Sequence, residues 1–347
     1  MRPQPLRSVF SGAWGEAVDA GTNALYHKCT ATVGVAGVFH SACGVLKEFF
    51  VIVSSLVAAY LFLGGAGAGA FVFATALIFL AGRRNAAGAG VRAGWCAKVA
   101  HRGFVVSVVL IVFGILCLVF DLGRPDQLLL LFRYPTLSFL SSGAYALALL
   151  VVCGSALIFL SRFDAARHAR RAAKVVAGVG TVVALYVMVY TGLLLRAVNV
   201  VPLWDSALLP VLFVLSSLAS GAACTVLCAR LIDDRFPFAL QFERKMSAID
   251  VALMALEAVV AAAYVAFATA HPLGAESVDR LLLGDVAPLF LGGFAVCGLL
   301  LPAAFDASVL CGRSREWTTF AAALLSLVGC FCLRLSLVCA GVHSAVG

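Results

Sequence analysis

The chain is 347 residues long and carries a formal net charge of +8, but 63% of its residues are hydrophobic and only 12% are charged. Soluble domains are roughly a quarter charged, so this composition, with a mean hydropathy of +1.05, excludes an ordinary soluble protein. Apolar runs long enough to span a bilayer as helices recur along most of the sequence. Because helices of this length satisfy their own backbone hydrogen bonds in lipid, an all-α integral membrane protein is predicted.

The first 48 residues differ from the rest of the chain. Residues 1–28 are polar and interrupted by glycine and proline, and the following apolar stretch is too short and too late for a secretory signal. Residues 29–46 could be read as a first span, but His40, Ser41 and several glycines and alanines make it a poor one. We expect residues 1–48 to form an extracytoplasmic or interfacial segment, or one that contacts a partner.

Eight better spans follow along the chain. They are predicted at residues 49–80, 103–120, 136–160, 174–196, 207–231, 247–270, 283–304 and 318–340. The loops after the first, third, fifth and seventh of these hold sixteen Lys and Arg residues, whereas the opposite side holds eight. Since basic residues stay on the cytoplasmic side, both termini are predicted to be extracytoplasmic. The basic charge therefore reports topology and does not indicate nucleic-acid binding.

A short repeat of small residues relates the two halves. Residues 62–70 read FLGGAGAGA and residues 214–222 read VLSSLASGA, with small side chains at matching offsets. Four spans separate the copies, so both enter the membrane in the same direction. This pattern predicts two parallel four-helix bundles, residues 49–196 and 207–340, packed closely along small-residue faces.

Charged residues within the spans are costly in lipid and therefore indicate function or pairing. Glu257 lies near the middle of the sixth span, and Asp250 lies seven residues earlier on nearly the same helical face. Of the charged residues within the spans, Glu257 is the best candidate for carrying protons. Asp250 could deliver protons to it from the cytoplasmic side. Arg334 and Asp285 are matched in depth, so the alternative of a purely structural ion pair is open for these two.

Two polar segments are predicted on the outer side. Asp121 follows the second span at a helix C-terminus, where it opposes the helix dipole, and Arg124 can compensate it. In residues 189–210, the fourth span ends in Tyr190, Thr191 and Arg196, ahead of a Pro/Trp turn. The two segments together predict a cluster of polar residues on the outer side of the membrane.

Resident redox cofactors are not expected in this chain. A b-type haem needs axial ligands, usually two histidines deep in the bundle, but all six histidines lie in loops or at span ends. The twelve cysteines contain no C-x-x-C pair, and most lie in apolar runs, where cysteine acts as a small hydrophobe. We expect no haem, no iron–sulfur cluster and no metal site.

Several short motifs together resemble the NrfD/PsrC family, the membrane subunits of polysulfide-reductase-like respiratory complexes. They are YLFLGGAGAG at 60–69, DLGRP at 121–125, YTGLL at 190–194, PLWDS at 202–206, Leu209-Pro210, Leu333-Arg334 and Ala340-Gly341. These motifs occur in order from the first predicted span to the eighth, and residues 1–47 fall outside them.

The resemblance implies a subunit that exchanges electrons between a membrane quinone, menaquinone or ubiquinone, and an extracytoplasmic ferredoxin-like iron–sulfur partner. That partner is often bound to a molybdopterin or multihaem catalytic subunit. In such proteins a tyrosine of the fourth span bonds the quinone, a role that falls on Tyr190 or, in second place, Tyr186. Where better-studied members carry Asn and His in the first span, this chain has Ser54, Ser55 and Tyr60. The expected quinone-binding set is Tyr190, Tyr186, Tyr60, Thr191, Asp121 and Arg124.

Two other classes of function compete with quinone exchange. A secondary transporter would also show repeats and charges at the midplane, although its repeats are often inverted. A structural membrane anchor would use the tyrosines and charges for packing alone. The sequence favours quinone exchange.

Overall fold

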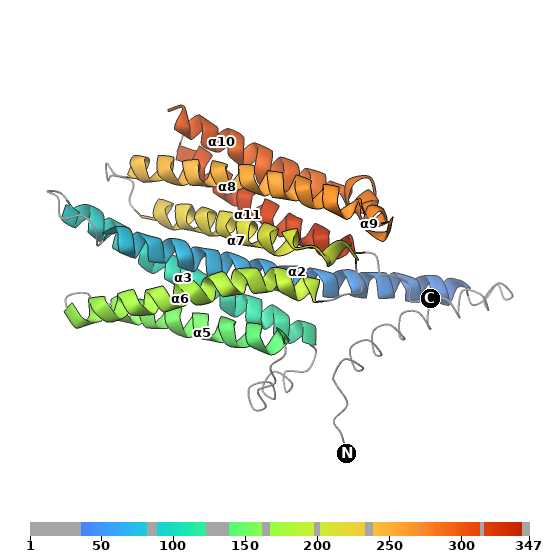
Figure 1. The fold of residues 1–347 in the computed structure, drawn as a ribbon, viewed down its shortest axis with the longest axis horizontal. Coiled ribbons are helices and arrows are strands. Elements are labelled where there is room, and N and C mark those ends of the chain that lie inside the picture. The colour runs from blue at the N-terminus through green and yellow to red at the C-terminus, as the bar shows by residue number, and fades with distance from the viewer. Residues whose placement is uncertain are drawn as a thin grey trace, which may run out of the picture. The chain divides into compact units, whose positions relative to one another are not determined.

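A computed structural model of the chain describes residues 36–81, 89–122, 139–161, 167–197, 202–232, 239–270, 272–312 and 316–341 (Figure 1). By its internal contacts the chain divides into two compact units, Met1–Val53 and Ser54–Gly347. Throughout the described ranges, all regular secondary structure is helical. The packing discussed below is that of the second unit.

The described elements follow one another along the chain as helices. They are α2 (Ala36–Ala81), α3 (Ala89–Leu122), α5 (Phe139–Leu160), α6 (Arg167–Arg196), η2 (Pro202–Trp204), α7 (Leu208–Arg230), α8 (Ala239–Ala268), α9 (Pro272–Leu282), η3 (Pro288–Leu300), α10 (Leu301–Leu310) and α11 (Glu316–Cys339). Among the described residues, eight helical segments are long and apolar enough to cross a membrane. Each of the eight predicted spans overlaps one of them, which confirms the all-helical membrane class.

Several helices extend beyond the predicted spans. α3 begins at Ala89 although the sequence predicts a span from residue 103, and α6 begins at Arg167 although its span is predicted from residue 174. The added turns contain Arg, Lys and Ala, which favour helix outside the hydrocarbon as well as inside it. α2 likewise begins at Ala36, within the stretch that the sequence assigns to an interfacial segment.

Helix α7 contacts helices from both halves of the sequence. It packs against α3 and α6 as well as against α8 and α11, while α5 packs against α3 and α6. Helix α10 contacts α8 and α11, so α8, α10 and α11 gather beside α7 (Figure 1). The division into two parallel bundles and the side of the membrane on which the termini lie stay predictions.

The two small-residue stretches pack against each other. A Cβ atom added at Gly69 of α2 would overlap the backbone of Ser217 in α7, and one at Gly221 would overlap the backbone of Gly69. These glycines therefore let α2 and α7 approach at backbone distance, as small residues do between membrane helices.

The seventh predicted span is not a regular α-helix. Residues Pro288–Leu300 form a π-helix, and the Leu301 N–H bonds to the carbonyl of Val296, five residues earlier. Pro302 follows directly; it has no N–H to donate, and its ring crowds the preceding turn, so regular α-helical bonding is disturbed here. The chain then continues as α10, which carries Asp306 into the buried interior.

Candidate functional site

Three tyrosines from two helices form the first candidate site, here called the tyrosine cluster: Tyr60 of α2 and Tyr186 and Tyr190 of α6. Tyr190 and Tyr60 are almost fully buried, whereas Tyr186 is 45% exposed on its helix. Tyr186 and Tyr190 lie one helical turn apart, and their rings stack with centroids 6.2 Å apart and 21° between the ring planes. The hydroxyl groups of Tyr60 and Tyr190 lie within interaction range of one another.

The Tyr190 hydroxyl is the most informative atom of the cluster. It is buried and has no hydrogen bond of acceptable geometry to any described residue, an arrangement that calls for an explanation because buried polar groups are nearly always bonded. Its ring fits only because residue 143 of α5 is glycine, since a Cβ there would overlap the phenol. The protein thus makes room for this ring and leaves its hydroxyl available.

The hydroxyls around Tyr190 are used within the protein. Thr191 donates its hydroxyl hydrogen bond to the Met188 carbonyl at 2.7 Å, and Tyr186 donates to the Ser142 hydroxyl at 3.0 Å. Thr191 can therefore accept a hydrogen bond from a ligand but does not present its proton. The structure brings Tyr190, Tyr186, Tyr60 and Thr191 of the predicted set together.

The structure does not describe the side chains of the rest of the predicted quinone-binding set. Arg124 falls between two described ranges, and Asp121 is in the last turn of α3 with a side chain that is not described. The side chains of Ser54 and Ser55 are likewise not described. Their place in the site stays a prediction.

The turn after α6 is fixed to the second half of the chain. The Trp204 Nε1–H donates to the Leu337 carbonyl at 2.9 Å, and the Tyr264 hydroxyl donates to the Leu203 carbonyl at 2.7 Å. Arg196 and Asp205 form an exposed ion pair at 3.2 Å across the same turn. These contacts hold the turn that follows α6 against α8 and α11.

A second group of buried polar residues runs along α7, α8, α10 and α11, and we call it the polar column. It consists of Glu243, Ser247, Asp250 and Glu257 of α8, Ser217 and Arg230 of α7, Asp306 of α10, and Thr319 and Arg334 of α11. At the end near the basic loops, Arg230 pairs with Glu243 at 3.1 Å and donates to the Thr319 hydroxyl. Glu257 is buried further along α8, and it interacts electrostatically with Asp250.

The predicted ion pair between Arg334 and Asp285 is wrong. Asp285 lies 3.7 Å from Arg280, a neighbour along the chain, and its side chain is largely exposed. Arg334 is fully buried and donates to the Ser217 hydroxyl at 2.7 Å and to the Phe213 carbonyl at 3.3 Å. Matched depth is the basis of the prediction, but depth does not say which way a side chain faces, and Arg334 faces α7 and α2.

Arg334 is also the cationic partner of Glu257. The two side chains are close enough to interact electrostatically, and the guanidinium lies 5.3 Å from the ring centroid of Phe213 and 5.8 Å from that of Phe62. A charge in this apolar interior is tolerable only with such compensation. Glu257 is thus one end of an electrostatically linked pair.

Sequence reasoning missed Asp306, Ser247, Thr319 and the Arg230–Glu243 pair. The seventh span is predicted to end at residue 304, which places Asp306 in a loop. The sixth is predicted to begin at residue 247, which places Glu243 outside it. Extending both helices by two turns would have turned these residues into buried charges within a span, which is the signal that could have found them.

The comparisons with known proteins place the chain in a family. The sequence profile "Polysulphide reductase, NrfD" matches residues 48–345, so the chain belongs to the NrfD family of multi-pass membrane proteins. It is 27% identical over 308 residues to the C subunit of polysulfide reductase from Wolinella succinogenes, and the match covers 82% of this chain and 92% of that protein. The family and this relative indicate a membrane subunit of a respiratory oxidoreductase that works in a complex with other subunits, and the cytoplasmic membrane is consistent with both.

Proposed function

We propose that this chain exchanges electrons between a quinone of the membrane and an extracytoplasmic, ferredoxin-like iron–sulfur subunit, itself bound to a molybdopterin or multihaem catalytic subunit. The observation that carries the proposal is the buried Tyr190 hydroxyl, which makes no hydrogen bond of acceptable geometry to a described residue and lies near a second buried phenol, Tyr60. Tyr186, exposed on a span that faces lipid, lies next to it and marks the side from which a quinone would enter.

The chemistry follows from the two hydroxyl groups. A quinol loses two protons and two electrons when it becomes a quinone. The Tyr190 phenol can donate a hydrogen bond to a quinone carbonyl and accept one from a quinol hydroxyl, while Leu, Val and Phe side chains hold the isoprenoid tail. Tyr190 lies about 9 Å from the end of α6, so the ring is held near the membrane surface where a partner subunit can take the electrons.

The polar column supports a route by which protons can exchange between the loop end of the bundle and the quinone region. Glu257 and Asp250 lead from the middle of α8 toward the basic loops, which the charge bias places in the cytoplasm. At the end of the column that is farther from the basic loops, Arg334 and Ser217 lie against Gly65 of α2. A Cβ atom added at Gly65 would come within 2.6 Å of the Arg334 guanidinium. Gly65 is about 7.5 Å along the same helix from Tyr60. Helix α2 thus links the column to the tyrosine cluster.

Replacing Tyr190 by Phe tests the site. One hydrogen bond is worth about 0.5–1.5 kcal/mol net, so quinol oxidation with an artificial acceptor should slow roughly two- to tenfold in Tyr190→Phe. Its melting temperature in detergent should be nearly unchanged, since the hydroxyl makes no bond of good geometry to the described residues. The matched control is Tyr264→Phe, which removes a buried hydroxyl bonded to the Leu203 carbonyl and should lower the melting temperature without slowing quinol oxidation.

The structural anchor would reverse this pattern. If Tyr190→Phe melted earlier while its quinone kinetics stayed at the wild-type rate, Tyr190 would serve packing alone. The quinone site would then have to be sought elsewhere in the chain.

Topology and cofactors complete the proposal. Reporter fusions at Gly347 and in the 162–174 loop should place the C-terminus outside and the loop in the cytoplasm, and the opposite result would overturn the predicted orientation. The purified chain should show no haem absorption and no bound iron–sulfur cluster. A reduced-minus-oxidised b-type spectrum from the purified chain would contradict that prediction.

A further inference from the structure

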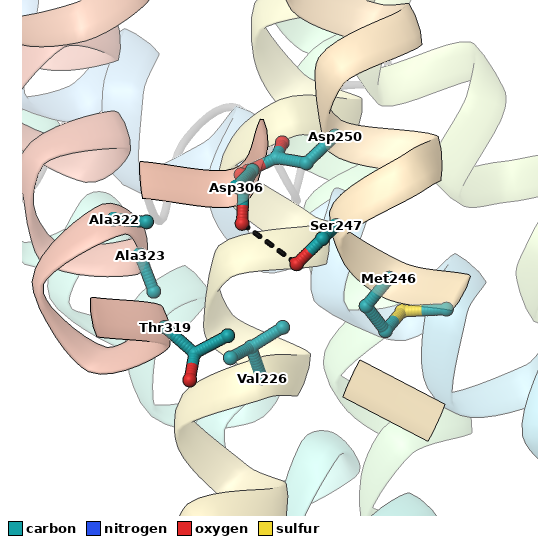
Figure 2. A pocket seen from close by; sticks show the side chains of 8 residues that line it. All are labelled: Val226, Met246, Ser247, Asp250, Asp306, Thr319, Ala322 and Ala323. Carbon is teal, nitrogen blue, oxygen red and sulfur yellow. Dashed lines mark hydrogen bonds between the residues drawn. The ribbon is translucent and has the colours of Figure 1, made fainter. Parts of the chain in front are cut away.

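Two aspartates from different helices meet in the polar column (Figure 2). The Ser247 hydroxyl donates to Asp306 Oδ1 at 2.7 Å, and the carboxyl group of Asp250 lies within hydrogen-bonding range of the carboxyl group of Asp306. Asp250 is 6% exposed and Asp306 is 3% exposed. Asp250 Oδ1 and Asp306 Oδ2 have no hydrogen-bond partner among the described residues.

The contact between the two carboxyl groups sets their joint charge. An ionised carboxyl group is an acceptor only, so two carboxyl groups can bond to each other only when one of them carries a proton. Two buried negative charges at this distance would also repel each other strongly. The cations of the column are engaged elsewhere: Arg230 pairs with Glu243, and Arg334 bonds Ser217 and interacts with Glu257. The aspartate pair is therefore compensated by a proton.

A small cavity adjoins the pair. Its volume is about 10 Å³, which is about the least space that one water molecule occupies. Ser247, Asp250, Asp306 and Thr319 line it together with Val226, Met246, Ala322 and Ala323 (Figure 2). The polar lining gives a water its hydrogen-bond partners.

The cavity leads toward the loop end of the bundle. Thr319, one of its walls, accepts a hydrogen bond from Arg230, and the side chains of Arg230 and Glu243 are 14% and 10% exposed. In the other direction, Asp250 interacts with Glu257, about 10 Å further along α8. The pair thus lies between the mostly buried Arg230–Glu243 ion pair near the loop end and the Glu257 carboxyl group near the middle of α8.

We propose that Asp250 and Asp306, with Ser247, form a binding site for one exchangeable proton, which enters from the Arg230–Glu243 end past Thr319. On loading, an O–H bond of a hydronium ion breaks as an O–H bond to a carboxylate oxygen forms, so that a water molecule is left and the charge of the pair changes from −2 to −1. No electron moves in this step. The inference rests on the proposed function only for the use of the proton, which passes on to Glu257.

Infrared spectroscopy of the whole chain in lipid nanodiscs tests the site. Wild-type protein should show the C=O stretching band of a protonated carboxylic acid, shifted in D₂O and lost as the pH is raised. Asp250→Asn and Asp306→Asn should each abolish this band, because a single remaining carboxyl group has no partner with which to share the proton. Glu276→Gln, an exposed carboxyl group on α9, is the matched control and should leave the band intact.

Two further variants assign the proton. Ser247→Ala removes the hydrogen bond to Asp306 and should shift the band without abolishing it, and this variant is expected to fold even if an Asn variant does not. A band that disappears only in Glu257→Gln, that survives both Asn variants, or that does not move in Ser247→Ala would overturn the proposal. So would a band that responds to Na⁺ at constant pH, since the site would then hold a metal cation.

The same preparation separates this proposal from the proposed function. Tyr190→Phe should keep the carboxylic acid band at full intensity while its quinol oxidation slows. If the band behaves as expected but Tyr190→Phe oxidises quinol at the wild-type rate, the proton site stands and the tyrosine site fails. If quinol oxidation slows in Tyr190→Phe but the band is insensitive to both Asn variants, the tyrosine site stands and the proton site fails.

Discussion

The tyrosine cluster and the region around Arg334 are both buried and both polar, yet the protein treats them differently. Tyr190 is neutral and its hydroxyl has no hydrogen bond of acceptable geometry among the described residues. Arg334 is also fully buried, and its Nε and Nη1 atoms have no partner among the described residues, but its Nη2 donates to a hydroxyl and a carbonyl, and two aromatic rings and a carboxyl group lie nearby. Leaving a buried neutral hydroxyl without a hydrogen bond until a ligand binds has a moderate free-energy cost, whereas a charge in an apolar interior has to be compensated within the fold.

This difference predicts where mutations will be felt. Substitutions around Arg334 should act mainly on stability, because they remove compensation from a buried charge. Substitutions at the tyrosine cluster should act mainly on quinone kinetics, because the protein itself depends little on the Tyr190 hydroxyl. The following predictions test this difference between the two regions.

The largest effect is expected for Arg334→Met. The substitution removes two hydrogen bonds and leaves Glu257 without its cation, and breaking a buried pair in this way costs about 3–5 kcal/mol. Thermal unfolding in detergent should show a marked loss of melting temperature, or the protein should fail to accumulate in the membrane.

A double variant separates charge compensation from packing in this prediction. Arg334→Met combined with Glu257→Gln removes both charges and should recover part of the lost melting temperature. If the double variant were as unstable as the sum of the two single variants, Arg334 and Glu257 would not be coupled, and the contrast with Tyr190 would lose its electrostatic basis.

The close contact between α2 and α7 should be the next most sensitive. In Gly69→Ala the new methyl group would meet the backbone of α7, and overpacking of this kind costs about 1–3 kcal/mol, here at the upper end because backbone cannot step aside. Gly178→Ala on α6 is the matched control, since an added Cβ there has open space and gains helix propensity. Equal melting temperatures for the two variants would mean that α2 and α7 are not in backbone contact.

The helices of this fold were predictable because hydrophobic length is a strong signal in a membrane protein. The repeat of small residues was also visible in the sequence, but not that its two copies touch, since Gly69 and Gly221 are brought together only by the path of the chain. The π-helix at Pro288–Leu300 was missed, because periodicity over one apolar run does not distinguish α from π geometry.

The candidate site was predictable to a different degree. Tyr190 and Tyr60 came from the resemblance of short motifs to a family, and no periodicity argument would have paired them. Glu257 could be picked out from the sequence because a carboxyl group in the middle of a span is costly. Its partner Arg334 is 77 residues away in sequence, and the sequence does not show that the two side chains point toward each other. Asp306 cannot be recognised as a buried charge from the sequence, because it lies just beyond the predicted end of a span, where charged residues usually belong to a loop.

A smaller, mixed effect is expected for Gly143→Ala. The added methyl group would overlap the Tyr190 ring, so the phenol must move by about 1.5 Å to reach an ordinary carbon–carbon contact distance. We expect a loss of about 1 kcal/mol in stability together with slower quinol oxidation than in Tyr190→Phe, because the ring as well as its hydroxyl is displaced. A melting curve and a quinol oxidation assay on one preparation check both. Unchanged kinetics beside lower stability would separate the Tyr190 ring from the quinone.

The smallest effect is expected for Tyr186→Phe. Its hydroxyl bonds Ser142 on an exposed face, so losing it should change stability by only about 0.5 kcal/mol, the low end for a single hydrogen bond. The ring remains stacked on Tyr190, so the maximal rate of quinol oxidation should stay close to wild type. If Tyr186 lines the entrance from lipid, the change should appear instead as a modest rise, roughly twofold, in the apparent KM for quinol. Titrating quinol in nanodiscs measures the two constants separately. A fall in the maximal rate as large as that of Tyr190→Phe would place Tyr186 at the reacting carbonyl, and the exposed and buried phenols would have to exchange roles.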